Sequence, residues 1–169
     1  MKKVFFSLVL LFLVKISFAQ TAVKDSLPVY ERFPTVPPFK IMTVPDSAAF
    51  TKDNLKKKKA VIIMVFSPDC SHCQHETKDL TAHMDLFKDV QIVMASHLDY
   101  NEILKFYKDY NIAAYPNITM GRDGEYMLGT FYSVHSYPSI FVYNKKGQFV
   151  KSFDGSYPIE KIADAVNNP

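Results

Sequence analysis

The chain has 169 residues, the size of one globular domain. Apolar residues make up 48% of it, with 14 phenylalanines and 10 tyrosines, which is enough for a packed core and excludes a disordered chain. Three of the 20 basic residues lie in the first fifteen positions, which carry no acid; the 17 that remain balance 17 acidic residues. This balance gives no support to nucleic-acid binding.

The first nineteen residues have the pattern of an export signal. Two lysines at positions 2 and 3 precede an apolar run over residues 4–14, and Ser17-Phe18-Ala19 is the small-x-small pattern of a signal-peptidase site. We therefore predict a signal peptide over residues 1–19, cleavage near Ala19, and a mature protein that is periplasmic or secreted. An uncleaved membrane anchor is the alternative, but the apolar run is short for a membrane span.

Residues 20–45 form a proline-rich lead-in, with prolines at positions 28, 34, 37, 38 and 45. Proline at this density excludes a helix or a central strand. We expect an extended segment that either packs onto the domain or moves as a tether. The side chains that would pack it are Tyr30, Phe33 and Phe39.

The folded domain is predicted to cover residues 46–169. A short edge strand is expected just before it, at residues 39–44. Asp46 or Ser47 then offers a helix N-cap, which predicts a short helix to about Leu55.

Two buried strands and two helices are predicted next. Residues 60–66 are apolar at every position, as a strand covered on both faces requires. Beyond Cys70, side chains that can face a core recur at three- and four-residue intervals to about Phe87, which predicts a long helix. A second strand is predicted at 90–95 and a second helix at 101–110. This alternation predicts a mainly parallel α/β core.

The chain's only two cysteines lie in the segment SPDCSHC, residues 67–73, between the first buried strand and the long helix. Cys70 is expected in the first turn of that helix, where unpaired N–H groups and the positive end of the helix dipole favour a thiolate. Cys73 lies one turn further along the same face, close enough to form a disulfide with Cys70. The spacing predicts a redox-active dithiol with one activated sulfur.

The last third of the chain divides into an irregular part and a regular part. Residues 111–135 contain aromatic and turn residues without a helical period. The apolar runs 140–143 and 148–153, joined by a turn, predict an antiparallel hairpin. Pro158 begins a closing helix that extends through Val166.

The cysteine motif, together with Tyr137-Pro138-Ser139 before the hairpin, resembles the active site of the thioredoxin superfamily, and in particular the exported TlpA/ResA-like redoxins. The resemblance covers about residues 39–169. It implies an α/β, thioredoxin-like fold: a central mixed sheet flanked by helices, with residues 111–135 inserted before the cis-proline strand. Pro138 is expected to be that cis-proline, facing the cysteines. Pro116 is the less favoured alternative, because no apolar strand follows it directly.

The resemblance implies a thiol-disulfide oxidoreductase without an organic cofactor, in which Cys70 attacks and Cys73 resolves the mixed disulfide. His72 would stabilise the thiolate, as in oxidising members of the family, whereas a carboxylate at Asp69 would oppose it. The direction of exchange, reductant or oxidant, therefore stays open.

A glutamate at the spacing of Glu76 takes part in proton management in ResA-like reductases, and we expect the same role here. The acid that thioredoxins place six residues before the first cysteine is replaced by Met64. Pro138 is expected to present the backbone of the preceding residue to a substrate peptide, which adds as a strand. The residues predicted to contact substrate are Ser67, Asp69 and Tyr137.

The expected partners are protein thiols and disulfides, together with a membrane electron-transfer protein of the DsbD/CcdA type for a reductant or the DsbB type for an oxidant. Metal delivery is the alternative function. Cys70, Cys73 and His135 are similar to the ligands of the Sco copper chaperones, and cysteine pairs also bind zinc. Sco proteins, however, separate their cysteines by three residues, not two.

Two further groups are expected to be structural, with a substrate groove as the alternative. The histidines at positions 75, 83 and 97 are expected at helix surfaces or strand ends. Tyr126, Phe131 and Tyr132 are expected to pack the 111–135 insertion.

Overall fold

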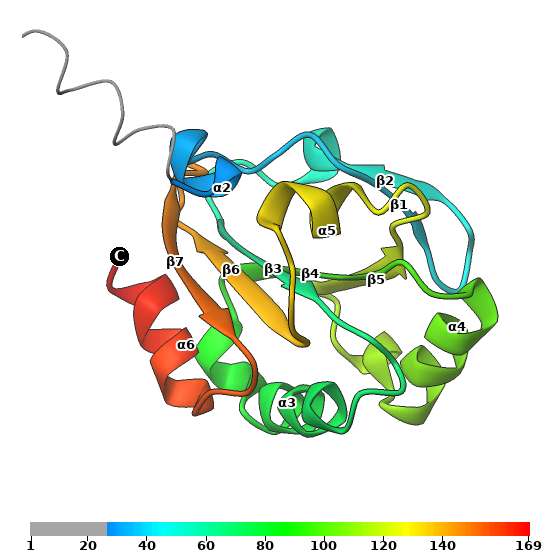
Figure 1. The fold of residues 1–169 in the computed structure, drawn as a ribbon. Helices are drawn as coiled ribbons and strands as arrows, with labels where there is room; N and C mark the ends of the chain where they lie inside the picture. The colour runs from blue at the N-terminus through cyan, green and yellow to red at the C-terminus, as the bar shows by residue number, and fades with distance from the viewer. Residues whose placement is uncertain (1–26) are drawn as a thin grey trace, which may run out of the picture.

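The computed structural model describes residues 27–169 (Figure 1). The predicted signal peptide and the first residues of the lead-in lie outside this part of the chain. A seven-stranded sheet has the order β2-β1-β5-β4-β3-β6-β7. Its strands are β1 Lys40–Thr43, β2 Ala49–Thr51, β3 Ala60–Val65, β4 Val90–Ser96, β5 Ile118–Arg122, β6 Ser139–Tyr143 and β7 Phe149–Asp154.

Helices cover both faces of this sheet (Figure 1). No helix within residues 27–169 is long and apolar enough to cross a membrane. The α-helices are α2 Val29–Arg32, α3 Ser71–Ala82, α4 Tyr100–Asp109, α5 Met127–Tyr132 and α6 Ile159–Asn167. Three short 3-10 helices join them: η3 Lys52–Asn54, η4 Met84–Phe87 and η5 Ile112–Ala114.

The central strand β3 is buried along its whole length, as predicted. It runs parallel to β4 and antiparallel to β6, so that Ile62 lies between Ile92 and Val142. Only β3, β4 and β5 run parallel, whereas the other four strand pairings are antiparallel. The mixed sheet is therefore confirmed and the mainly parallel core was wrong, because an antiparallel hairpin extends the sheet at each edge.

Alternate residues of β3 face two separate cores, since successive side chains of a strand point to opposite faces. The α3 face contains Ile62 and Met64 and is covered by α3, α4 and α6. The α5 face contains Val61 and Ile63 and is covered by α5, α2 and the chain leading into β1.

The proline-rich segment packs on the α5 face from Pro28 onward. Tyr30 contacts the ring of Phe141, with 5.3 Å between ring centroids, and Phe39 is buried. Thr35 forms a bridge to Gln148 beside β7. The packing predicted for Phe33 was wrong, because this side chain is 60% exposed.

The helix predicted between Asp46 and Leu55 was also wrong. After a cis Val44–Pro45 bond the chain turns back, with Thr43 N–H donating to the Ala48 carbonyl at 2.8 Å, and β2 pairs with β1. Asp46 accepts from the Thr43 hydroxyl, so it stabilises a turn instead of a helix N-terminus. The predicted edge strand is therefore β1, but it lies inside the sheet between β2 and β5.

The later elements agree with their predictions, with one difference. Helix α3 ends at Ala82 because His83 leaves the helical conformation, and the chain continues as η4, which still brings Phe87 into the core. Helices α4 and α6 and the β6–β7 hairpin form where expected. The 111–135 region contains β5, whose central place in the sheet its sequence did not indicate.

Candidate active site

The first cysteine caps helix α3 at the carboxyl end of the buried strand β3. Cys70 Sγ accepts a hydrogen bond from the Cys73 N–H at 3.3 Å, and its own N–H donates to the Ser67 carbonyl at 3.2 Å. The side chain is half-buried. The structure thus places Cys70 at the helix N-terminus, as predicted, with its sulfur within reach of another molecule.

The second cysteine is enclosed. Cys73 is 0% exposed, and neither cysteine forms a disulfide in this structure. Burial, followed by the hydrogen bond with Cys70, raises the pKa of the Cys73 thiol well above its usual range. A hydrogen bond with the Ser67 backbone acts in the opposite direction. The two sulfurs therefore differ as an attacking and a resolving thiol must: one is accessible, and the other is protonated and protected.

The segment before β6 faces the accessible sulfur. The Tyr137–Pro138 bond is cis and the Tyr115–Pro116 bond is not, which agrees with the prediction. The Cys70 thiol lies 3.5 Å from the Tyr137 carbonyl oxygen. The Ser139 hydroxyl donates to the Ser136 carbonyl at 2.8 Å and closes this loop.

A buried carboxyl group lies one helical turn beyond Cys73. Glu76 is 2% exposed; its Oε2 accepts the Tyr157 N–H at 3.2 Å, and its Oε1 is the one buried side-chain polar atom in residues 27–169 without a hydrogen-bond partner. Burial raises the pKa of this carboxyl, and the Tyr157 N–H offsets part of that effect. Such a carboxyl is protonated more readily than an exposed one.

The remaining predicted residues lie around the motif. Ser67 is buried, and its hydroxyl donates to the carboxylate of the exposed Asp69. His72 is exposed on α3, and its carbonyl accepts the Ser156 hydroxyl at 3.2 Å. A groove of about 710 Å³ adjoins the motif and extends between α3 and α4, from Pro68 to the end of α4.

Two neighbours of Tyr137 were expected to be structural, with a substrate groove as the alternative, and they lie next to the candidate site. The Tyr137 hydroxyl lies 3.4 Å from His97 Nδ1, and the His97 ring meets the Tyr126 ring edge-on at 4.7 Å between centroids. The sequence did contain an indication that His97 lies near the site, because His97 directly follows β4. The carboxyl ends of parallel strands meet at one sheet edge, so His97 had to lie near Cys70, which follows β3.

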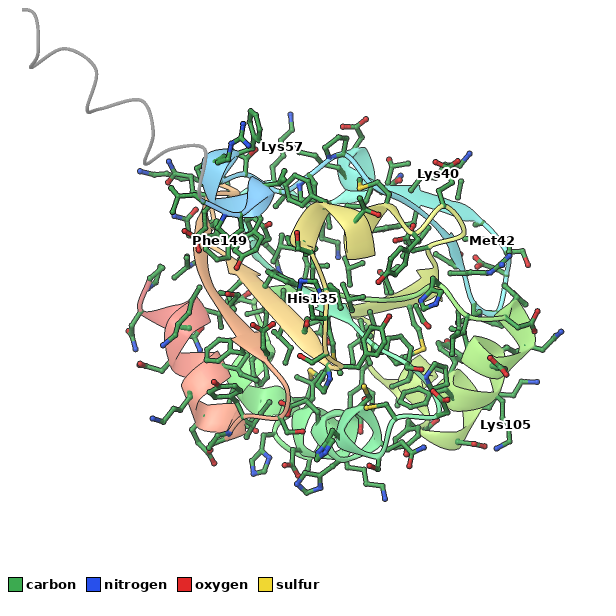
Figure 2. All side chains as sticks on the ribbon, viewed as in Figure 1. Lys40, Met42, Lys57, Lys105, His135 and Phe149 are labelled. Carbon is green, nitrogen blue, oxygen red and sulfur yellow. The ribbon has the colours of Figure 1, made fainter. Side chains whose placement is uncertain are left out.

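His135, the third ligand of the metal site considered above, does not form a metal-binding cluster with the two cysteines. His135 is exposed on the connection from α5 to β6 (Figure 2). Within residues 27–169, no three His, Cys, Asp or Glu side chains are arranged to hold a metal ion. The geometry therefore does not favour the metal-delivery alternative.

Comparison with known proteins agrees with this arrangement. A family model described as a thioredoxin-like domain matches residues 48–168. No curated protein matches the chain. Similar solved structures include a secreted Mycobacterium tuberculosis disulfide oxidoreductase homologous to Escherichia coli DsbE, which is 19% identical, with a TM-score of 0.65 and coverage of 78% of this chain and 96% of that chain.

Two more solved structures have the same fold. A thioredoxin-family thiol:disulfide interchange protein from Chlorobium tepidum is 18% identical, with a TM-score of 0.67 over 79% of this chain and 94% of that one. StoA from Bacillus subtilis is 20% identical, with a TM-score of 0.57 over 78% of this chain and 98% of its own. The predicted thioredoxin-like fold is confirmed.

Proposed function

The chain belongs to the family of thioredoxin-like domains, and from this premise we propose that it is an exported thiol-disulfide oxidoreductase acting on protein substrates through Cys70 and Cys73. One observation supports this function above the others. The half-exposed Cys70 sulfur lies at a helix N-terminus, 3.5 Å from the Tyr137 carbonyl, with the buried Cys73 thiol one turn behind it.

In the reducing direction, the Cys70 thiolate attacks one sulfur of a substrate disulfide. The substrate S–S bond breaks, a mixed disulfide with Cys70 forms, and the other substrate sulfur leaves as a thiolate. An extended substrate segment is held beside Cys70 by hydrogen bonds to the backbone of Tyr137, in the manner of an added strand. Pro138 contributes by fixing the direction of that backbone, and Ser67 and Asp69 border the same surface.

Resolution requires Cys73 to lose its proton and attack the Cys70 sulfur, which releases the second substrate thiolate and leaves a Cys70–Cys73 disulfide. Two electrons have then passed to the substrate. The raised pKa of Cys73 makes its deprotonation difficult without a nearby base. Glu76 is suited to accept this proton, because its Oε1 has no other partner. Proton transfer to a positioned side chain contributes about 10²- to 10⁴-fold in enzymes.

Export defines the partners. Cleavage near Ala19 would release the domain into an oxidising compartment, where its cysteine pair has to be regenerated by another protein. A reductant would receive electrons from a membrane protein of the DsbD/CcdA type, and an oxidant would deliver them to one of the DsbB type. His72 favours the oxidising direction by supporting the thiolate.

The proposed function is tested with the chain from Gln20 onward in an insulin-reduction assay. Replacing the attacking thiol in Cys70→Ser should abolish activity, and Cys73→Ser should accumulate mixed disulfides that mass spectrometry detects. Ser71→Ala, an exposed position between the two cysteines, is the matched control and should keep wild-type activity. Full activity in either cysteine variant would contradict the mechanism.

The reduction potential assigns the direction. Equilibration with glutathione buffers and counting of alkylated thiols would give a value near about −270 mV for a thioredoxin-like reductant, or near about −120 mV for an oxidant of the DsbA kind. In the second case, His72→Ala should shift the potential toward more negative values, because the thiolate loses its support.

A further inference from the structure

The 111–135 insertion holds one aromatic ring in an unusual position. Tyr126 precedes α5 in the left-handed conformation, with φ 52° and ψ 31°, which a non-glycine residue rarely adopts. Its N–H donates to the Asp123 carbonyl at 3.2 Å. The Asp123 carboxylate, 3% exposed, accepts the N–H groups of Met127 and Leu128 at 3.0 and 2.8 Å. A buried carboxylate therefore fixes the turn that presents Tyr126.

A glycine one turn further along α5 makes room for the same ring. A Cβ atom at Gly129 would lie 2.2 Å from Cε2 of Tyr126, well inside van der Waals contact. The backbone at Gly129 is helical, so glycine is not needed there for its conformation. Its missing side chain instead allows the Tyr126 ring to lie against the helix.

From this position the ring connects the insertion to the candidate active site. Tyr126 contacts His97 edge-on, and His97 Nδ1 lies 3.4 Å from the Tyr137 hydroxyl. Burial, followed by a hydrogen bond with the Tyr126 hydroxyl, raises the pKa of Tyr137 to about 12, so Tyr137 interacts with both Tyr126 and His97. The Tyr137 carbonyl in turn contacts Cys70.

We infer that Tyr126 and His97 are positioning residues that hold Tyr137 in place for substrate binding beside Cys70. This gives the insertion a function: it supports the substrate-binding segment from the side opposite the cysteine helix. The inference rests on the proposed function and deepens it. It concerns how a protein substrate is held beside Cys70.

The test is a steric displacement of the Tyr126 ring. Gly129→Ala should push the Tyr126 ring away, although the side chains of Tyr126, His97 and Tyr137 all remain. Alanine also has a higher helix propensity than glycine, so the substitution does not weaken α5 through its backbone. Gly124→Ala, five residues earlier in the same insertion, is the matched control, because a Cβ there meets nothing within 4 Å. Both variants are compared with the wild type for insulin reduction, for reaction with Ellman's reagent, and for reduction potential.

Gly129→Ala should lower kcat/KM for insulin by about tenfold, as a misplaced binding group does. Its reaction with Ellman's reagent, a small disulfide that is not held by the Tyr137 backbone, should fall much less than its reduction of insulin. Its reduction potential should change only through the contact between the Tyr137 carbonyl and Cys70. Gly124→Ala should be unchanged in all three. Equal insulin reduction by both variants, or an equal loss toward the small disulfide, would overturn the inference.

A double variant separates positioning by the ring from a general effect on α5. In a Tyr126→Ala background, Gly129→Ala should cause no further loss, since no ring remains to be displaced. Additive losses would contradict the inference.

A structural measurement distinguishes failure of the positioning role from failure of the proposed oxidoreductase function. Nuclear Overhauser contacts between the His97 and Tyr137 rings should weaken in Gly129→Ala and persist in Gly124→Ala. An inactive wild type would refute the proposed function, whereas ring contacts unchanged by Gly129→Ala would refute the positioning role.

Discussion

The two faces of the sheet are built in different ways. The α3 face is covered by three regular helices and contains both cysteines. Helices α4 and α6 bury apolar side chains, whereas α3 also buries the polar Glu76 and Thr77. The α5 face is covered by two short helices and a proline-rich segment, and aromatic rings in contact lie among its aliphatic side chains. The two cysteines thus lie on the side with the longer helices, whereas the other side is covered by shorter and less regular elements.

The candidate substrate site lies where these two faces meet. Within residues 27–169, Tyr137 is the one residue that packs against both cores, and its carbonyl reaches Cys70. On the proposed function, reactivity would depend on one side of the sheet, whereas the surface that receives the substrate would depend on both. The α5 face would then belong to the functional unit.

The largest effect is expected at the centre of the α5 face. Tyr132 stacks on Phe141, with 3.7 Å between ring centroids, and shares a 2.7 Å hydrogen bond with the Tyr143 hydroxyl. Tyr132→Ala should lower the free energy of unfolding in urea by about 3–5 kcal/mol, because it removes a buried aromatic side chain.

Tyr132→Phe is the control, since it keeps the stacked ring and leaves only the Tyr143 hydroxyl without its partner. Its cost should be about 1–3 kcal/mol. Both variants should unfold in a single transition, because the two cores share one sheet. Loss of the α5 face in a separate, earlier transition would show that this layer is an independent accessory.

A smaller effect is expected in the proline-rich segment. Tyr30 contacts the rings of Phe141 and Phe149 at 5.3 and 5.2 Å between centroids, and its replacement by alanine should cost about 2 kcal/mol. Phe33→Ala, three residues further along, should change stability by less than about 0.5 kcal/mol because that ring is exposed. Equal effects of the two changes in urea unfolding would mean that the segment does not pack as described.

The α3 face could be predicted better than the α5 face, because its elements are longer and more regular. The strand at 60–65 is apolar at every position because it is buried on both faces, and helices α4 and α6 have apolar residues at the fixed intervals that packing against a core needs. The turn at Pro45 was mistaken for a helix start because Asp46 and Ser47 are common in both. Only the pairing of β1 with β2, which the local sequence does not encode, decides between them.

The candidate site divides in the same way. Cys70, Cys73 and Pro138 could be placed from local motifs, since strand, turn and helix fix their positions. Burial of Glu76 could not, because the backbone N–H that binds its carboxyl group belongs to Tyr157, 81 positions away in the sequence. The Tyr126 ring depends on a left-handed residue and a distant histidine, and neither leaves a periodic signal.

The smallest effect is expected on the α3 face, where the Glu76 carboxyl makes the free energy of unfolding depend on pH. Its pKa is raised in the folded protein, so its favourable contribution is fully present below the ordinary value of 4.5 and is lost as the pH rises through the raised pKa. Glu76→Gln removes the buried charge and should therefore stabilise the protein by about 1 kcal/mol at pH 7. The difference from wild type should vanish near pH 4.

Glu125→Gln, at an exposed position, is the matched control and should change the stability at pH 7 by less than about 0.5 kcal/mol. The Gln variant at position 76 should also resolve mixed disulfides more slowly, which stopped-flow quenching with an alkylating agent measures. A more stable yet slower protein is the combination expected if the α3 face keeps a buried carboxyl for proton transfer at a cost in stability. A variant that is less stable at pH 7, and as fast as wild type, would show that Glu76 is a structural residue whose contact with Tyr157 outweighs its burial.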